Sequence, residues 1–414
     1  MMTTNTSAKA DTVWVNGVLA TMDPARDDQY GLLDDHCLVT GGETILGVEP
    51  RENLNWEAYP VTIDLKGALI TPGFIDCHTH LVFGGNRSAE WEKRLSGASY
   101  SQVAAEGGGI NTTVRATREA SVAELCASGR KRLRAMLREG VTTVEIKSGY
   151  GLTLDDERKI LAVARTLKET EAVDIAPTLL AAHSVPPEYA GRTDGYVDEI
   201  VSRILPQLWH EGLFEAVDVF CEDVAFDLGQ TERIFAAARD LGVPVKAHSE
   251  QLSNTTVTRL LARYGGLSSD HLEHLDEESV KALAVSGGVA VLLPTAFYFL
   301  RDTNVPPVAL LRQYGVPIAV ATDFNPGTSP FSSIRLAMNM ACTLFGLTAP
   351  EAMAGVTRNA ARALGREAWQ GQLTAGYQAN FAVWDLSRPV DILYELSWNP
   401  LLKRVFKGRV IDIV

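Results

Sequence analysis

The chain has 414 residues, of which 46% are hydrophobic and 21% charged, the composition of a folded globular protein with a large core. Asp and Glu outnumber Lys and Arg by 51 to 38, and the formal charge of -13 argues against nucleic acid or an anionic membrane as a partner. The 5 cysteines form no C-x-x-C pair, which argues against a disulfide framework and for a reducing compartment.

Both ends of the chain have the pattern of β-structure. Between residues 13 and 68, short β-type runs are separated by hairpin signals such as Asn16-Gly17. The pattern returns in residues 380–384 and 404–411. We therefore expect one small sheet domain that is built from both termini around a different middle.

The middle alternates apolar, β-branched runs with amphipathic helical patterns. The strand candidates are residues 69–76, 141–147, 173–182, 216–221, 243–247, 268–272, 289–293 and 318–322. The helical patterns are residues 122–138, 155–169, 230–241, 257–264, 277–286 and 308–314. Strands that alternate with helices in this number favour a closed (β/α)8 barrel over an open sheet. We predict the barrel over residues 69–365, with the sheet domain formed by residues 1–68 and 366–414.

Two connections in the predicted barrel are unusually long, residues 81–121 and residues 183–215. Long connections at the carboxyl ends of barrel strands tend to be lids or pocket walls. Gly107-Gly108-Gly109 lies in the first, but no P-loop lysine follows it and no strand directly precedes it. We interpret this segment as a flexible loop and not as a phosphate cradle.

Histidines gather where the predicted strands end. His78 and His80 follow the first strand, and the alternation of side chains in a strand places both imidazoles on one side. A bare H-x-H also fits two solvated histidines, so the residues at the other strand ends must distinguish this interpretation from a metal site. They carry residues 147–150, His183, Glu222, His248, His271 and Asp323. Because strand ends of a barrel meet at one rim, imidazoles with one carboxylate predict a Zn²⁺ or Fe²⁺ site. His36 and His210 fit structural or solvated roles, and His274 is ambiguous.

Several separate segments resemble the amidohydrolase superfamily of metal-dependent barrels. They are PGFIDCHTH at residues 72–80, EIKSGYG at 145–151, KAHSEQ at 246–251, DHLEH at 270–274 and TDFNPGT at 322–328. The resemblance covers the whole chain and implies a TIM-like barrel with a small β-sandwich formed by both termini. The segments are most similar to the members that open the ring of 4-imidazolone-5-propanoate, giving N-formimidoyl-L-glutamate in the third step of histidine degradation. The resemblance also implies a homodimer.

The same resemblance implies roles for individual residues. A single Zn²⁺ or Fe ion would be held by His78, His80, His248 and Asp323. Substrate or product would be held by Arg87, Tyr150, His183, Gln251, Asn325, Gly327 and Thr328. Asp323 would pass the proton of the attacking water to the ring nitrogen, and His271 would stabilise the oxyanion or hold that water. Gln251 stands where some members carry Glu, which leaves open its part in proton transfer.

The planar guanidinium of Arg87 suits the propanoate carboxylate. It would be the local cation that an acidic protein needs to bind an anionic substrate. The alternative is a surface charge in a loop.

Two other functions stay open for the whole chain: another amidohydrolase, such as a deaminase of purine or pyrimidine rings, and a catalytically silent barrel scaffold. The chain shows no basic, apolar leader and no apolar run that spans a bilayer, so we expect a cytoplasmic protein.

Overall fold

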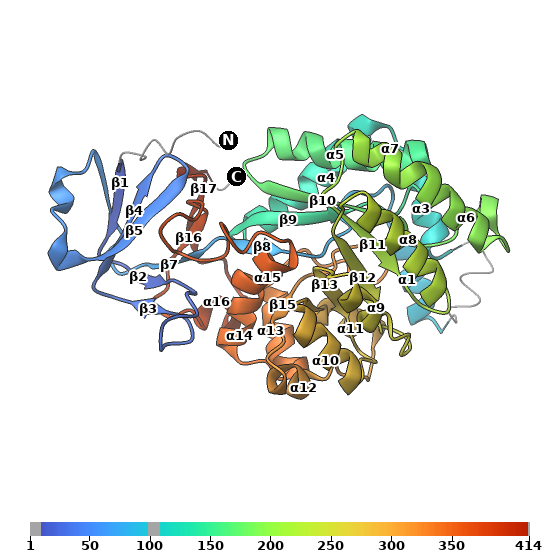
Figure 1. Ribbon diagram of the computed structural model, residues 1–414. Helices are drawn as coiled ribbons and strands as arrows, with labels where there is room; N and C mark the ends of the chain where they lie inside the picture. Colours follow the sequence, from blue (N-terminus) through green and yellow to red (C-terminus); the bar gives the residue numbers. More distant parts are fainter. Residues whose placement is uncertain (1–9, 98–107, 413–414) are drawn as a thin grey trace.

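Strands from both ends of the chain form two sheets beside the barrel in the computed structural model, which describes residues 10–97 and 108–412 (Figure 1). One sheet has the order β5 (Thr44–Pro50), β4 (His36–Gly41), β1 (Thr12–Val15) and β6 (Val61–Asp64). The other has the order β18 (Arg409–Ile411), β17 (Leu401–Phe406), β16 (Phe381–Trp384), β7 (Leu69–Pro72), β2 (Val18–Ala20) and β3 (Leu32–Leu33).

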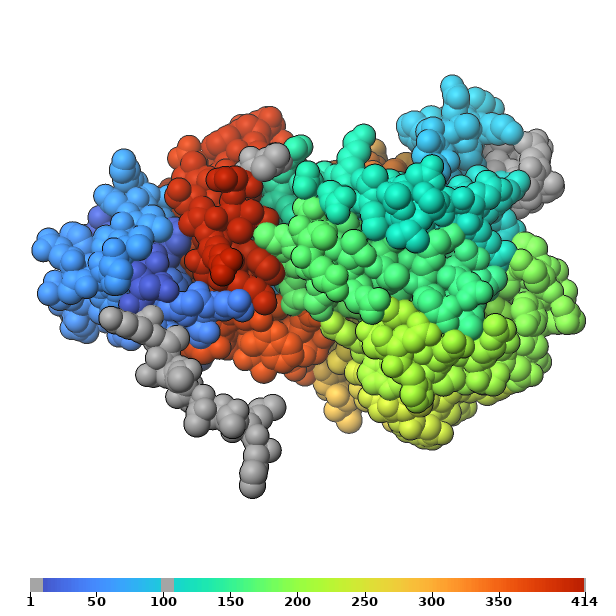
Figure 2. All heavy atoms as spheres, turned by 90° about the horizontal axis from the view of Figure 1, so that it is seen from above, coloured from blue at the N-terminus to red at the C-terminus, as the bar shows by residue number. Residues whose placement is uncertain are grey.

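The two terminal sheets share an apolar core. Trp14 on β1 meets Phe381 on β16 edge to face, with ring centroids 5.0 Å apart, in a cluster that draws residues from both sheets. Figure 2 shows the red C-terminal segment between the blue N-terminal strands and the remainder of the molecule. The predicted sandwich of both termini is therefore confirmed, while the division of the chain at residues 68 and 365 stays a prediction.

The barrel strands follow one another around the sheet in chain order. Within the described residues they are β8 (Phe74–Asp76), β9 (Val141–Lys147), β10 (Asp174–Ala182), β11 (Ala216–Phe220), β12 (Val245–Ser249), β13 (Ser268–His271), β14 (Val289–Leu292) and β15 (Ile318–Val320). All neighbouring pairs are parallel. Just beyond β8 and β15, Thr79 and Phe324 form a parallel bridge, and His80 N donates to Phe324 O at 2.9 Å. The predicted TIM-like barrel is confirmed.

The predicted strand over residues 69–76 is wrong in one respect, because it is two strands in different sheets. β7 pairs with β2 and β16 in the sandwich, whereas β8 pairs with β9 in the barrel. The chain changes sheet at Gly73, whose N–H donates to Asn380 O at 3.0 Å. A Cβ at this position would overlap the Thr142 side chain, so only glycine fits the crossing.

Helices surround the barrel strands, as Figure 1 shows. The predicted ones are α4 (Val122–Leu137), α5 (Leu154–Thr170), α8 (Leu228–Asp240), α9 (Val257–Arg263), α10 (Glu277–Ser286) and α12 (Val308–Gln313). Capping boxes at Ser121 and Asp227 begin α4 and α8. Outside the two long connections, the helices that the sequence patterns did not predict are η1 (Arg51–Asn53), η2 (Trp56–Ala58), α11 (Pro294–Leu300), α13 (Ile334–Phe345), α14 (Ala349–Gly355), α15 (Arg358–Ala363) and α16 (Asp391–Tyr394).

Both long connections contain helices. The first carries α1 (Ser88–Leu95) and α3 (Ile110–Glu119), with Gly109 directly before α3 at a φ of 77°. Gly107 lies outside the described residues. The second carries η3 (Pro187–Tyr189), α6 (Thr193–Glu199), η4 (Ile200–Ile204) and α7 (Leu205–His210). Among the described helices, none has the length and apolarity needed to cross a membrane.

Candidate active site

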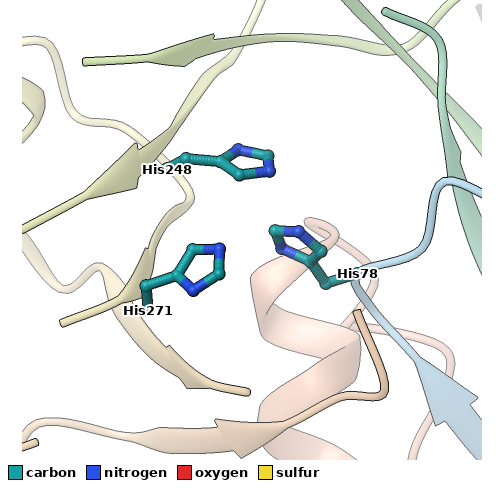
Figure 3. Close-up of side chains that lie close together, drawn as sticks. All are labelled: His78, His248 and His271. Carbon is teal, nitrogen blue, oxygen red and sulfur yellow. The ribbon is translucent and has the colours of Figure 1, made fainter. Parts of the chain in front are cut away.

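His78, His80, His248 and Asp323, the predicted metal ligands, lie together at the carboxyl end of the barrel. The Nε2 atoms of His78 and His80 lie 3.4 and 3.5 Å from Asp323 Oδ1, so both imidazoles point to one side as predicted, but the strand ends at Asp76 and the H-x-H pair lies just beyond it. His248 Nε2 lies 3.3 Å from His80 Nε2. Figure 3 shows the rings of His78, His248 and His271 converging from separate segments of the barrel, His78 from the coil after β8.

The donor chemistry of this cluster fits a metal ion. The ligand atoms of His78, His80 and Asp323 lie within 4.8 Å of one another, and so do those of His78, His248 and His271. Burial lowers the pKa of His78, His80 and His271 well below the usual value, which keeps the imidazoles neutral and able to ligate. His78 Nε2 is buried and forms no hydrogen bond with the described residues. A cation would satisfy that nitrogen.

Two aspartates orient two of the histidines, one on β11 and one on β13, the strands on either side of β12. His78 Nδ1 donates to Asp270 Oδ2 at 2.6 Å, and His248 Nδ1 lies 3.0 Å from Asp218 Oδ2. A carboxylate at Nδ1 favours the tautomer with its proton there, which leaves Nε2 free to bind a metal. Both rings are therefore held with Nε2 toward the cluster.

Asp323 is placed by the loop that follows β15. Its backbone has a φ of 48°, an unusual conformation for a residue other than glycine. The preceding Thr322 donates from Oγ1 to Asp76 Oδ2 at 2.6 Å, and His78 N contacts Asp76 Oδ1 at 3.5 Å. Burial raises the pKa of Asp76 to about 7. Asp76 thus links the H-x-H segment to the loop that carries Asp323.

Tyr150 and His183 stand beside the predicted metal ligands, at the rim where the sequence placed them. The His183 ring stacks on the His80 ring with centroids 5.0 Å apart, and the Tyr150 ring lies 5.3 Å from His183. His183 Nδ1 donates to Gly149 O at 3.0 Å, so its Nε2 is the free acceptor. Burial lowers the pKa of His183 to about 3 and raises the pKa of Tyr150. The site therefore presents a neutral imidazole and a protonated phenol.

Arg87 lies in the turn directly before α1, largely buried, and not on an open surface. Its Nε donates to Glu90 Oε2 at 2.9 Å, and its Nη2 also pairs with the Glu90 carboxylate. Its Nη1 lies so close to Gly327 that a Cβ there would overlap it. Arg87 and the loop after β15 therefore meet at the barrel mouth, where both are predicted to bind substrate.

The loop of Asn325, Gly327 and Thr328 is organised by the Asn325 amide. Its Oδ1 accepts from Gly327 N at 2.8 Å and from Thr328 N at 2.7 Å, while its Nδ2 donates to Asp323 O at 2.7 Å. These bonds occupy much of the Asn325 side chain, so its clearest role is to shape the loop. Its predicted contact with substrate stays a prediction.

Gln251 is nearly buried in the loop after β12. Its backbone N–H donates to Glu222 Oε1 at 2.8 Å, and Glu222 also accepts from Leu252 N and Ser253 Oγ. Glu222, at the end of β11, therefore anchors this loop. The roles of Gln251 in binding and catalysis stay predictions.

The remaining histidines lie apart from the cluster. The His274 ring faces Asn304 Nδ2 at 3.1 Å, so this ambiguous residue has a partner elsewhere. His210 is exposed on α7, and its Nδ1 donates to Pro206 O at 2.5 Å. His36 begins β4 in the sandwich. The last two thus have the structural or solvated roles that the sequence predicted.

Sequence reasoning missed the residues that support the site. They are Asp76, Asp218 and Asp270, to which no role was assigned although Asp76 and Asp270 lie in the segments that resemble the family, and Lys147, which was noted only as part of a strand end. Glu157 was also missed. It accepts backbone hydrogen bonds from Gly149, Gly151 and Leu152 and so holds the loop of Tyr150. One signal was available: a charged side chain inside an apolar strand is costly to bury and marks a paired network.

Comparison with known proteins identifies the family. The model of the amidohydrolase family matches residues 69–414. An imidazolonepropionase of Photorhabdus laumondii is 59% identical over 398 residues, which cover 96% of this chain and 96% of the relative. The chain belongs to the amidohydrolase family, and within it to the imidazolonepropionase family. A second imidazolonepropionase, from Klebsiella pneumoniae, is 58% identical over 96% of this chain and 98% of the relative.

Solved structures show the same fold in more distant proteins. An adenosine deaminase of Xanthomonas campestris with bound zinc matches with a TM-score of 0.69 at 19% identity, over 97% of this chain and 92% of that one. An atrazine chlorohydrolase of Arthrobacter aurescens, in complex with zinc, matches with a TM-score of 0.66 at 18% identity, over 96% of this chain and 94% of that one. At these identities the likeness concerns the fold alone.

Proposed function

We propose that this chain hydrolyses 4-imidazolone-5-propanoate to N-formimidoyl-L-glutamate, the ring opening of a cyclic amide in the third step of histidine degradation. The observation that carries the proposal is the 59% identity to an imidazolonepropionase over nearly the whole of both chains. Neither alternative function has comparable support, because the adenosine deaminase is only 19% identical.

His78, His80, His248 and Asp323 would hold one Zn²⁺ or Fe ion. The zinc in the two structurally similar proteins and the neutral, converging imidazoles support this assignment. When bound, such an ion lowers the pKa of water to about 7 and polarises a carbonyl oxygen, which are the needs of amide hydrolysis at neutral pH. Which of the two metals is bound stays open to measurement.

The protein's own groups would do the positioning and the proton transfer. Asp323 takes the proton of the attacking water and delivers it to the departing ring nitrogen. Burial raises the pKa of Asp323 well above its usual value, and a bound cation would lower it. His271, whose ring lies 5.4 Å from that of His248, stabilises the oxyanion or holds the water.

Different residues would bind the two ends of the substrate, the propanoate and the ring. Arg87 keeps its Nη1 edge toward the loop of Gly327 and Thr328, where it binds the propanoate carboxylate. His183 Nε2 accepts a hydrogen bond from a ring N–H, because Nδ1 is already a donor to Gly149 O. The Tyr150 hydroxyl donates to substrate or product, and Asn325 and Gln251 complete the pocket.

The test is an ultraviolet assay of imidazolone propanoate consumption with protein of known metal content. We expect turnover with about one equivalent of zinc or iron per chain, loss of turnover after chelation, and recovery on adding the metal back. Metal-loaded protein that leaves the substrate untouched would refute the function. Sedimentation analysis of the same sample would test the predicted homodimer.

A further inference from the structure

A layer of charged side chains lies inside the barrel. It consists of Glu145, Lys147, Asp218, Lys246 and Asp270, each with 0% of its surface exposed. The interiors of such barrels are usually filled with branched apolar side chains. Moving a charge from water into a protein interior costs several kcal/mol per ion unless close partners compensate. A layer of this kind is therefore expected to serve the site that it contacts.

Lys147 is the central cation of this layer. Its Nζ lies 2.6 Å from Asp218 Oδ2, 3.0 Å from Glu145 Oε2 and 3.5 Å from Asp270 Oδ2. A lysine ammonium has three N–H donors, so three carboxylates can share it. Burial lowers the pKa of Lys147, but the three carboxylates outweigh this effect and hold the pKa well above its usual value. The side chain is thus a permanent cation.

The atoms that Lys147 contacts are those that orient the histidines. Asp218 Oδ2 faces His248 Nδ1 at 3.0 Å, and Asp270 Oδ2 accepts from His78 Nδ1 at 2.6 Å. One ammonium group therefore touches both oxygens that fix two of the proposed metal ligands. These ligands come from segments far apart in the sequence, one after β8 and one on β12.

We propose that Lys147 is a positioning residue of the metal site, which holds Asp218 and Asp270 in place so that His248 and His78 present Nε2 to the ion. The proposal rests on the metal site assigned above. Replacing a residue that supports metal ligands through hydrogen bonds typically weakens metal binding by about 10–100-fold. Because Lys147 supports two such carboxylates, we expect its loss to fall toward the upper end of that range.

The test is Lys147→Met, which keeps most of the side-chain length and removes the charge. Metal-free protein would be titrated with Co²⁺ in competition with a chelator, and the visible spectrum of the Co²⁺-loaded protein would be recorded. We expect affinity to fall by about 10–100-fold and the spectrum to change, since the ligand arrangement is altered. Affinity within about threefold of the parent and an unchanged spectrum, in a variant whose circular dichroism shows it folded, would overturn the proposal.

Lys246→Met is the matched control. Lys246 is equally buried in the same layer, but its Nζ binds Glu145 Oε1 at 2.8 Å and Cys77 O at 3.2 Å. Among the described contacts it forms no ion pair with Asp218 or Asp270. We expect its effect on Co²⁺ affinity to be about tenfold smaller than that of Lys147→Met. Equal losses in the two variants would show a general effect of charge in the barrel and would overturn the assignment.

Asp218→Asn serves if Lys147→Met does not fold. This substitution keeps the size of the side chain and removes the charge that Lys147 contacts at 2.6 Å. We expect weaker Co²⁺ binding here too, and unchanged affinity would overturn the proposal. Metal binding is measured without substrate, so the outcomes are separable: protein that binds metal normally but leaves imidazolone propanoate intact would refute the function and not the role of Lys147.

Discussion

Replacing Arg87 with Met tests the assignment of the substrate. Two of the five N–H donors of Arg87, on Nε and Nη2, are used by Glu90, and Nη1 faces the Gly327 loop. Among the described residues, the hydrogen bonds of Arg87 use neither Nη1 nor the remaining Nη2 hydrogen, so this edge can bind a carboxylate. If the substrate carries propanoate, Arg87→Met removes that pair of bonds and leaves Glu90 without its ion pair to Arg87, while the Gly109 N–H stays bound to the Glu90 carboxylate.

The size of the effect follows from these bonds. A hydrogen bond to a charged group contributes about 1.5–3 kcal/mol, so a bidentate pair contributes about 3–6 kcal/mol. At about 1.4 kcal/mol for each factor of ten, kcat/KM should fall by about 10²–10⁴-fold. The propanoate takes no part in bond breaking, so it is bound alike in the ground and transition states. Most of the loss should therefore appear in KM.

The ultraviolet assay over a range of substrate concentrations measures this loss. Arg94→Met, which removes the same charge from α1, the helix that directly follows Arg87, is the control and should keep kcat/KM within about threefold. Gly327→Ala provides a second approach, because the added Cβ would displace the Arg87 guanidinium and should raise KM. If Arg87→Met keeps kcat/KM within about tenfold of the parent, Arg87 does not bind a substrate carboxylate, and the alternative function of a deaminase is again favoured.

Three further predictions concern the metal cluster and its neighbour. Asp323→Asn should lower kcat by more than about tenfold while substrate binding changes little, and activity closer to the parent than that would exclude Asp323 as the proton carrier. His248→Ala should reduce the metal content measured by atomic spectroscopy, and an undiminished metal content would remove His248 from the ligand set. Burial lowers the pKa of His183 to about 3. Between about pH 6.5 and pH 3 the unfolded chain therefore binds one more proton at this residue than the folded chain, so lowering the pH destabilises the fold. In metal-free His183→Gln protein, the free energy of unfolding should therefore fall less steeply with decreasing pH, by up to about 1.4 kcal/mol per pH unit, and identical slopes in urea titrations would contradict the shift.

Much of the site could be predicted because barrel geometry converts sequence position into spatial position. Each predicted strand ends at the same rim, so His78, His183, His248 and Asp323 could be grouped without any knowledge of their contacts. The H-x-H spacing also predicted that two imidazoles point the same way, and Asp323 Oδ1 lies near the Nε2 atoms of both. These inferences need only the local period of a strand.

Contacts between side chains far apart in the sequence depended on the tertiary structure. Lys147 meets Asp218 across 71 residues, and His78 meets Asp270 across 192. Whether these groups pair is decided by strand register and by rotamers inside the barrel, and neither has a local signature in the sequence. The change of sheet at Gly73 is of the same kind, because the apolar pattern of residues 69–76 runs through it unbroken.

The sequence by itself therefore determined the fold class, the rim at which the chemistry gathers and the family resemblance, since all three depend on periodicity and motif order. Only the tertiary structure revealed that Arg87 is held by Glu90 against Gly327, and that one buried lysine lies under two of the histidines. The physical reason is that burying a charge is tolerated only beside its partners, and which partners these are is decided by packing.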